Sequence, residues 1–297
     1  MLWKDQRRSD NVEDDRGNSA GPVLAVGGGI GTLVIMVIAV LLGADPRQLL
    51  QQLPQNGPPG AGAGPGGGPG EGPQVKRPVD PAEEEAADFV KVILATTEDV
   101  WKEQFRLMGT TYQEPKLRYF TGNVNTDGCG FASAAVGPFY CPADSRVYLD
   151  LSFFNELKRR FKAPGEFAQA YVVAHEVGHH IQNLMGTSSK VDALRRRASK
   201  EESNALSVRM ELQADFLAGV WAYHVQKTKH LLEPGDIESG LKAAQAIGDD
   251  KIQMEAQGYV RPDSFTHGSS EQRSRWFRKG FETGDIRQGD TFNANPL

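Results

Sequence analysis

The stretch PVLAVGGGIGTLVIMVIAVLLGA, residues 22–44, carries no charged side chain. About 20 apolar residues can cross a bilayer as a helix. A buried core helix is usually shorter and keeps a polar face, and a signal peptide ends in a small-residue cleavage site that is not evident here. The stretch therefore predicts one transmembrane helix in a lipid bilayer. Its Gly27 and Gly31 have a spacing that allows close helix packing, which weakly favours a homo-oligomer.

The cations that flank residues 22–44 predict the orientation of this helix. Four precede it and one follows it closely, namely Lys4, Arg7, Arg8 and Arg16 before it and Arg47 after it. Because cytoplasmic flanks carry the excess of Lys and Arg, we expect residues 1–21 to be a cytoplasmic segment. The same rule places the remainder of the chain on the extracytoplasmic side.

A second change in composition separates this helix from a folded domain. Residues 45–79 include PQNGPPGAGAGPGGGPGEGPQ, which cannot bury enough apolar surface to fold and is typical of a disordered linker. We expect residues 80–297 to form one domain. The net charge of −5 shows no basic excess, so no nucleic-acid partner is expected.

The periodicity of residues 80–297 predicts a mainly helical α+β domain with a small sheet. Asp80 as N-cap and Pro81 at the first helical position begin a helix that Gly109 can end. Two stretches, 116–122 and 146–154, predict strands. Further helices are expected near 152–162, 165–185, 203–228, 236–247 and 269–282.

Both cysteines, Cys129 and Cys141, lie in the loop between the two predicted strands. Two nearby cysteines in an exported domain most simply form a disulfide bond. Two unrelated buried thiols are the alternative, and a zinc pair is disfavoured because no second pair completes a tetrahedral site.

The segment AHEVGHHIQNLMG, residues 174–186, carries three of the six histidines. In a helix, His175 and His179 lie one turn apart on the same face and can hold Zn²⁺, with Glu176 beside them as a general base. The preceding residues are apolar, and buried imidazoles are costly unless they are paired or bound to metal. His180 lies about 100° around the helix from His179. We therefore interpret His180 as a packing or outer-shell residue.

A catalytic zinc needs a third protein ligand and an open position. The apolar segment RMELQADFLAGVWAYH supplies Glu211 and Asp215 on one helix face. We expect Glu211 to complete a His₂Glu site and Asp215 to accept the remaining ring N–H of a ligand histidine. The alternative, two solvated carboxylates, conflicts with their apolar neighbours.

Together, HEVGHH and ELQAD resemble the glutamate-ligand branch of the HExxH zinc peptidases. More narrowly, the chain resembles the bacterial putative neutral zinc metallopeptidase family, on stretches that include RRSDNVEDDRG, GCGFASAAVGPFYC, AYVVAHEVGHHIQNLMG and MELQADFLAGVWA. The resemblance implies a zincin-like fold and peptidase chemistry.

The resemblance also singles out THGSSEQR, residues 266–273, which is similar to the Thr-His-Pro…Arg stretch of membrane-associated endopeptidases. It implies that His267 or Arg273 stabilises the oxyanion, although Gly268 stands where those proteins have proline. A simple helix N-terminal loop, capped by Ser269 or Ser270, is the alternative.

These features predict a zinc peptidase in the inner membrane of a bacterium, with its catalytic domain outside the cytoplasm and peptides or proteins as substrates. A substrate strand is expected along an edge strand near Tyr148. A zinc-stabilised binding or scaffold module without catalysis is the alternative from another class. A metal-dependent amidase that acts on cell-wall peptides would use the same site.

Overall fold

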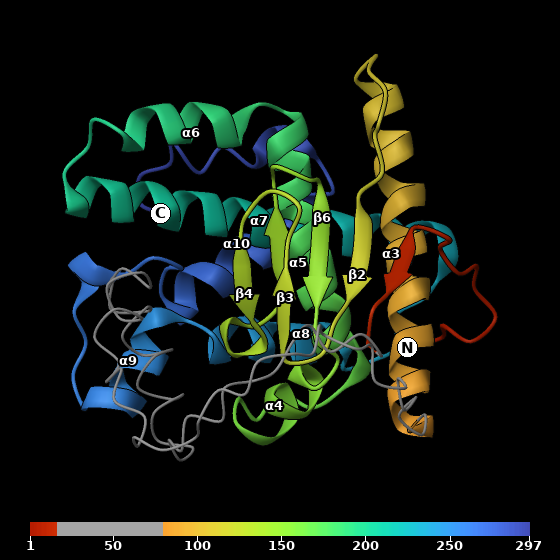
Figure 1. Ribbon diagram of the computed structural model, residues 1–297. Helices are drawn as coiled ribbons and strands as arrows, with labels where there is room; N and C mark the ends of the chain where they lie inside the picture. The colour runs from red at the N-terminus through yellow and green to blue at the C-terminus, as the bar shows by residue number, and fades with distance from the viewer. Residues whose placement is uncertain (17–79) are drawn as a thin grey trace, which may run out of the picture.

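The structure, a computed structural model, describes residues 1–16 and 80–297 (Figure 1). This part of the chain contains eight α-helices and two small sheets, so the predicted mainly helical α+β class is confirmed. The predicted transmembrane helix at 22–44 and the linker at 45–79 lie outside the described residues. In the two ranges that are described, no helix has both the length and the hydropathy needed to cross a bilayer.

The larger sheet is mixed and has the strand order β1-β2-β6-β5. Three strands run parallel and the last pairs antiparallel with β6: β1 (Val12–Asp14), β2 (Lys116–Tyr119), β6 (Arg146–Leu149) and β5 (Phe139–Cys141). A separate hairpin contains β3 (Asn123–Asn125) and β4 (Phe131–Ser133). Both predicted strands are therefore present, although each is shorter than its predicted range.

The first strand comes from the region that the sequence assigned to a separate cytoplasmic segment. β1 pairs with β2 in the register Val12↔Leu117, Glu13↔Arg118 and Asp14↔Tyr119. Its sequence, Val-Glu-Asp, has no apolar alternation, so it becomes a strand because the backbone edge of β2 is available to it. Residues 1–16, which we call the amino-terminal arm, lie along α3 and β2 (Figure 1).

Six of the eight helices in the described ranges were predicted, and two, α6 and α9, were not. The helices are α3 (Pro81–Leu107), α4 (Phe153–Arg159), α5 (Glu166–Leu184), α6 (Thr187–Arg195), α7 (Lys200–Lys229), α8 (Asp236–Ala246), α9 (Asp249–Gln257) and α10 (Ser270–Thr283). Only Val191 of α6 is buried, and the buried residues of α9 are polar. Neither helix therefore carries the apolar stripe by which a helix is detected in a sequence.

Helix ends follow the predicted capping chemistry. Asp80 accepts a hydrogen bond from the Ala82 N–H at the start of α3, where Pro81 occupies the first helical position. Ser269 caps α10 and forms a capping box with Gln272, so Ser269 rather than Ser270 is the cap. This cap fixes where α10 begins, and with it the position of the site residues on either side.

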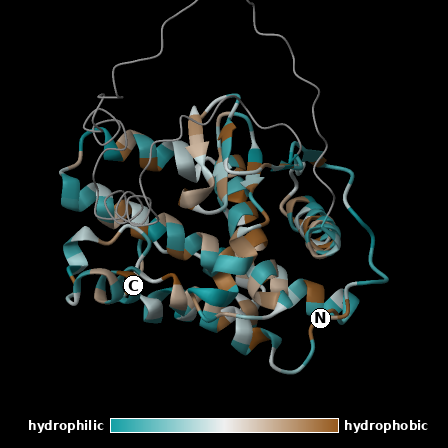
Figure 2. Cartoon of the chain, turned by 60° about the horizontal axis from the view of Figure 1, so that its bottom comes forward, coloured by the Kyte–Doolittle hydropathy of each residue, from teal (hydrophilic) through white to brown (hydrophobic). Residues whose placement is uncertain are grey.

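The core lies where α5 passes between the large sheet and α7. Fourteen of the 19 residues of α5 are buried, and hydrophobic ribbon concentrates in this central region, as Figure 2 shows. α7 also packs closely on α10, because a Cβ at Gly219 would clash with the Phe277 carbonyl and one at Gly280 with the Phe216 carbonyl. The three helices that carry the predicted site residues thus form one packed unit.

Candidate metal centre

Three side chains that the sequence predicted as ligands converge between α5 and α7. One ligand atom from each of His175, His179 and Glu211 lies within 4.8 Å of the others. Glu211 Oε2 is 3.2 Å from His175 Nε2, and Glu211 Oε1 is 3.4 Å from His179 Nε2. The two imidazole rings are nearly perpendicular, with centroids 4.8 Å apart. Two nitrogens and a carboxylate oxygen are therefore presented to one point.

The other ring nitrogen of each histidine is already engaged. His175 Nδ1 lies 2.8 Å from Asp215 Oδ1, and His179 Nδ1 lies 2.9 Å from Gln182 Oε1. The Gln182 amide donates to the Met210 carbonyl and to Gln213, so its oxygen faces His179 and accepts. With Nδ1–H as the donor in both rings, both Nε2 lone pairs point at the Glu211 carboxylate. Such an arrangement of acceptors requires a cation or a proton between them.

The charges around His175 also favour a cation or a proton at this point. Burial by itself lowers the pKa of His175, but Asp215 and Glu211 outweigh burial and raise this pKa to about 10. Burial raises the pKa of Glu211, yet the two histidines hold it well below its usual value. A His₂Glu set with these charges fits Zn²⁺, which takes histidine nitrogen and carboxylate oxygen in a tetrahedral site with one open position.

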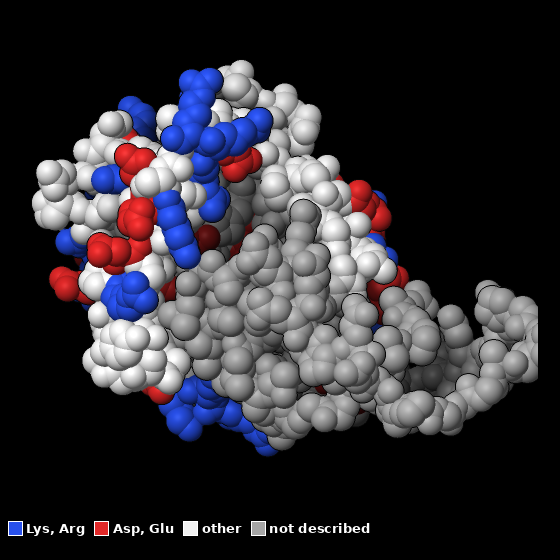
Figure 3. All heavy atoms as spheres, turned by 60° about the vertical axis from the view of Figure 1, so that its left-hand side comes forward, with Lys and Arg blue, Asp and Glu red and all other residues white. Residues whose placement is uncertain are grey.

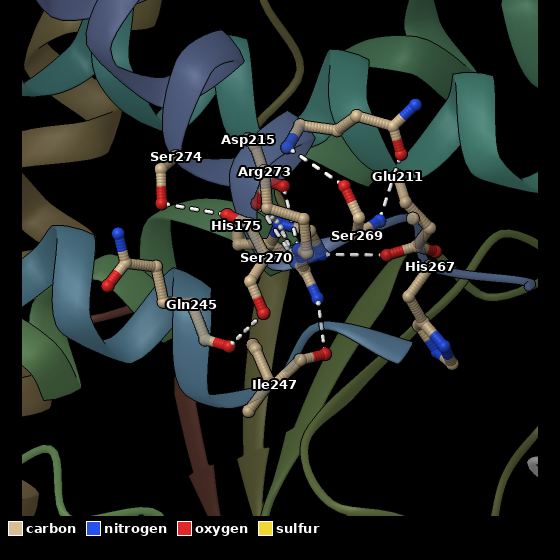
Figure 4. A network of polar contacts seen from close by, with 12 residues as sticks. His175, Glu211, Asp215, Gln245, Ile247, His267, Ser269, Ser270, Arg273 and Ser274 are labelled. Carbon is tan, nitrogen blue, oxygen red and sulfur yellow. Dashed lines mark hydrogen bonds and ion pairs between the residues drawn. The ribbon is translucent and has the colours of Figure 1, made fainter. Parts of the chain in front are cut away.

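Asp215 is held by a cluster that extends beyond the predicted partner (Figure 4). Arg273 Nε and Nη2 donate to its two oxygens at 2.8 and 2.9 Å, and Tyr171 Oη–H donates to Oδ1 at 2.5 Å. Asp215 and Tyr171 are fully buried, and Arg273 is 2% exposed. Burial raises the pKa of Asp215, but Arg273 and His175 lower it further than burial raises it. The carboxylate therefore stays ionised behind His175.

This cluster changes the expectation for Arg273. Both oxygens of Asp215 occupy its Nε and Nη2, and its Nη1 is 3.4 Å from the Ile247 carbonyl oxygen. Because two of its nitrogens donate to Asp215, the guanidinium orients that carboxylate. Of the two alternatives for stabilising an oxyanion, the geometry therefore disfavours Arg273.

His267 faces the same cavity from the loop before α10. Its Nδ1 is 3.1 Å from Asp249 Oδ1, which leaves Nε2 for the cavity. The backbone N–H groups of Thr266, His267 and Gly268 donate to Asp249 Oδ2 at 2.6, 2.6 and 3.0 Å. Gly268 has a φ of 93° and donates its N–H. A proline can neither adopt this φ nor donate an N–H. Asp249 therefore anchors this loop in a way that a loop with proline at position 268 could not use.

Glu176 is 8% exposed and lines the cavity beside the three predicted ligands. Burial raises the pKa of its carboxyl group. Two residues further on, a Cβ at Gly178 would lie 3.0 Å from the Ala214 carbonyl oxygen. The chain that comes close at this glycine is the backbone of α7. The close approach brings Glu211 and Asp215, which flank Ala214, within reach of the histidines.

The cavity has a volume of about 800 Å³. Its lining includes the site residues His175, Glu176, His179, Glu211, His267 and Arg273, the charged residues Glu156, Arg160, Asp192 and Arg195, and a larger apolar surface. The apolar lining includes Val136, Phe139, Tyr140, Phe153, Phe161, Val172, Val191, Met210, Ile247 and Ile252. The room and the lining suit a bulky organic substrate.

The outer strand beside this cavity is β5, which pairs with β6 at Tyr148, so the edge lies next to Tyr148 and does not contain it. Tyr148 is in β6, which pairs with β2 on one side and β5 on the other, and its side chain is buried. Residues 139–141 lie in the loop that the sequence predicts between its two strands, and the structure shows that they form a strand. Cys141 of β5 forms the predicted disulfide bond with Cys129, so that prediction is confirmed.

Sequence reasoning missed four residues that hold the site, namely Tyr171, Gln182, Asp249 and Tyr140. Two of them carried a local signal, because Tyr171 lies one turn before His175 and Gln182 one turn after His179 on α5. Asp249 and Tyr140 come from distant segments, and nothing local in the sequence connects them with the motif.

Comparison with known proteins agrees with this geometry. Residues 1–292 match the model of a family described as putative neutral zinc metallopeptidase. The uncharacterized protein YpfJ of Escherichia coli K12 is 48% identical over 303 residues, which cover 99% of this chain and 100% of YpfJ. The uncharacterized protein Mb2605 of Mycobacterium bovis is 40% identical over 269 residues, 87% of this chain and 86% of that protein. No solved structure matches. The chain therefore belongs to the putative neutral zinc metallopeptidase family, as its motifs predicted.

Proposed function

We propose that the protein is a zinc-dependent peptidase with a zincin-like catalytic site. One observation carries the proposal: Nε2 of His175, Nε2 of His179 and the Glu211 carboxylate converge on one point of a cavity that Glu176 also lines. A structural zinc site is closed by four protein ligands, whereas this one offers three and opens to the cavity. When bound, zinc would supply a Lewis acid for the scissile carbonyl and lower the pKa of water.

In this proposal Glu176 moves the protons. Its carboxylate accepts a proton from the attacking water and delivers it to the leaving amine. Burial raises the pKa of Glu176, so its carboxylate accepts a proton more readily than that of an exposed glutamate. Asp215, fixed by Arg273 and Tyr171, holds the Nδ1 proton of His175, so that Nε2 stays available as a ligand.

His267 is proposed to stabilise the oxyanion. Burial lowers the pKa of His267, but its bond to Asp249 and the charges of Glu211 and Asp249 raise it overall. A protonated imidazole held through Nδ1 offers Nε2–H to the cavity as a donor. Arg273 supports this chemistry only through Asp215.

An extended peptide is the substrate that the cavity fits best. Strand β5 is one of the two outer strands of the large sheet within the described ranges, and its Phe139 and Tyr140 line the cavity. A peptide that pairs with a sheet edge gains main-chain hydrogen bonds and places alternate side chains in pockets. Acidic and basic residues are interspersed over the described part of the face in Figure 3. We therefore expect the apolar lining, more than net charge, to select side chains.

We propose that this activity lies on the extracytoplasmic side of a bacterial membrane. The disulfide between Cys129 and Cys141 supports this location, because disulfide bonds persist mainly in oxidising compartments.

The decisive experiment compares the wild type with Glu176→Gln on peptide libraries, with bound zinc measured in both. The variant should keep its zinc and lose turnover by at least about 100-fold, because general acid–base catalysis contributes roughly 10²–10⁴-fold. Glu98→Gln is the matched control, since Glu98 is also a buried glutamate but lies outside the cavity. It should keep its activity.

Two results would contradict the peptidase proposal. Equal behaviour of the wild type and Glu176→Gln on every library would leave a zinc-binding module without catalysis. Cleavage of cell-wall peptides alone, lost in Glu176→Gln, would identify an amidase that uses the same site.

A further inference from the structure

The third histidine of the HEVGHH motif contacts the outer strand and is not one of the three converging ligands. His180 is 1% exposed, and its Nε2 lies 2.6 Å from the Gln113 carbonyl oxygen. A carbonyl only accepts, so Nε2 carries the proton and Nδ1 of the neutral ring is an acceptor. That acceptor lies 2.9 Å from Tyr140 Oη, whose hydroxyl must therefore donate to it. Every polar atom of the ring is thus used to connect α5 with two other segments.

Tyr140 is the element that these bonds fix. Its Oη also accepts a hydrogen bond from Asn183 Nδ2 at 3.1 Å, and its ring lies edge-on to His180 at 5.4 Å. Tyr140 lies in the middle of β5 and lines the cavity. With its hydroxyl turned to His180, the tyrosine ring contributes to the wall of the cavity and its backbone to the outer edge of the sheet.

We propose that His180 is a positioning residue for substrate binding, which holds Tyr140 and strand β5 in register with the metal-binding face of α5. This inference rests on the proposed peptidase function. His179 and His180 are adjacent, so the helix that fixes one metal ligand also fixes the strand on which an extended peptide would lie. A displacement of the strand relative to the metal would misplace the scissile bond, and misplacement of about 1 Å is costly in catalysis.

The test compares His180→Gln with Tyr140→Phe in steady-state assays on one cleaved peptide. Glutamine retains a donor for the Gln113 carbonyl, and phenylalanine retains the ring, so each variant removes mainly the link between His180 and Tyr140. Both should raise KM by about 10-fold, with kcat changed less than about threefold and zinc content unchanged. The double variant should be no worse than either single variant, because both remove the same link.

A purely structural role would lower the melting temperature of both variants and leave KM unchanged, and that result overturns the inference. Loss of zinc in His180→Gln would overturn it as well. If the wild type cleaves no peptide, the proposed function fails and this inference fails with it. An active wild type with unchanged KM in both variants overturns this inference alone.

A different observation, the packing of the amino-terminal arm, carries a second inference. Trp3 is 4% exposed, packs edge-on against Phe89 at 5.2 Å, and donates its Nε1–H to Glu166 Oε1 at 2.9 Å. Glu166 is the first residue of α5, and Phe89 is in α3. The arm thus places an aromatic anchor between two helices of the domain.

The arm also satisfies a buried charge of the domain. Glu98 of α3 is 1% exposed and accepts hydrogen bonds from Arg7 at 2.8 Å, from Asn11 at 2.9 Å and from Ser9 Oγ. Without the arm, this carboxylate would lose these three donors, and an unpaired buried charge is strongly unfavourable. The edge of β2 that pairs with β1 would also lose its partner. Arm and domain are therefore one folding unit.

From this packing we infer that residues 1–16 and residues 80–297 lie in the same compartment. A chain that crosses a membrane once between residues 16 and 80 would separate Trp3, Arg7 and Ser9 from their partners. This inference replaces the expectation of a cytoplasmic segment 1–21 with an external domain, and the disulfide favours an oxidising compartment for both parts.

Cysteine labelling in intact cells tests the inference with the full chain. Asp10→Cys marks the arm and Lys158→Cys marks the domain, and both positions are exposed. The native cysteines are paired with each other and so do not react with a maleimide. A membrane-impermeant maleimide applied before and after permeabilisation should label both variants alike. Labelling of one variant and protection of the other before permeabilisation overturns the inference.

Discussion

Glu98 and Glu211 are glutamates on neighbouring long helices, and their partners differ in kind. Glu98 receives an arginine, a serine and an asparagine, all of them hydrogen-bond donors. Glu211 faces two histidine nitrogens whose opposite ring atoms are already used as donors, and its side chain is 20% exposed to the cavity. The first carboxylate is satisfied by the protein alone. The second is satisfied only when a cation or a proton joins it, which distinguishes a binding site from a structural cluster.

The largest expected effect is the loss of the cation. Glu211→Gln removes the one anionic ligand, so we expect the protein to lose its bound zinc and its turnover. The loss of zinc affinity should exceed the roughly 10–100-fold that loss of an outer-shell partner costs. Zinc affinity can be measured by competition with a chromophoric chelator. Unchanged affinity in Glu211→Gln would show that the two carboxylates are equivalent after all.

Asp215→Asn should have the next largest effect. It weakens the orientation of His175, so zinc affinity should fall by about 10–100-fold. It also leaves the Arg273 guanidinium, which is 2% exposed, without its carboxylate. Removal of one partner of a buried ion pair costs roughly 3–5 kcal/mol in the free energy of unfolding. Chemical denaturation of the zinc-free protein measures this loss, and a stability equal to that of the wild type would argue against the described pairing.

Glu98→Gln should change stability without changing the metal centre. A neutral amide cannot accept from Arg7, Ser9 and Asn11 as the carboxylate does, so we expect a loss of about 1–3 kcal/mol. Zinc affinity should equal that of the wild type, because Glu98 does not line the cavity. Urea denaturation together with chelator competition separates the two effects. A parallel loss of zinc affinity would remove the distinction between the two carboxylates.

The smallest expected effect is a pH dependence from the pair of His267 and Asp249. The pKa of His267 is raised above 6.5 in the folded protein, so its contribution to stability is present below pH 6.5 and is lost as the pH rises through the raised pKa. The difference in stability between the wild type and His267→Gln should therefore shrink from pH 5.5 to pH 9. Denaturation at both pH values measures it. In an Asp249→Asn background, the difference should no longer depend on pH in this way, whereas a difference that grows with pH would contradict the assignment.

Much of the metal site could be predicted from the sequence. His175, His179, Glu211 and Asp215 share helix faces by their i, i+4 spacing, and an apolar surrounding marked both helices as buried. Local periodicity could predict that these residues share a helix face, because each i, i+4 pair lies within a single helix. That the two helices meet at these residues depends on Gly178, and only the structure shows that the backbone of α7 packs against it.

The amino-terminal arm shows what local patterns could not express. Its charged residues flank an apolar segment, and the rule for membrane flanks explained them without reference to the domain. In the structure Arg7 and Arg16 pair with acids of α3, and β1 is a strand only because β2 lies beside it. The pairing of Arg273 could not be seen locally either, since its partner Asp215 lies 58 positions away in the chain.

The contacts of α7 with its two neighbours also determine which parts of the molecule can move. At Gly178 it touches the backbone of α5, and at Gly219 and Gly280 it touches the backbone of α10. Backbone packed on backbone leaves no side chain that could rearrange to allow sliding, so the three helices move as a rigid block. We therefore expect any widening of the cavity for a bulky substrate to come from α6, whose single buried residue, Val191, lines the cavity wall.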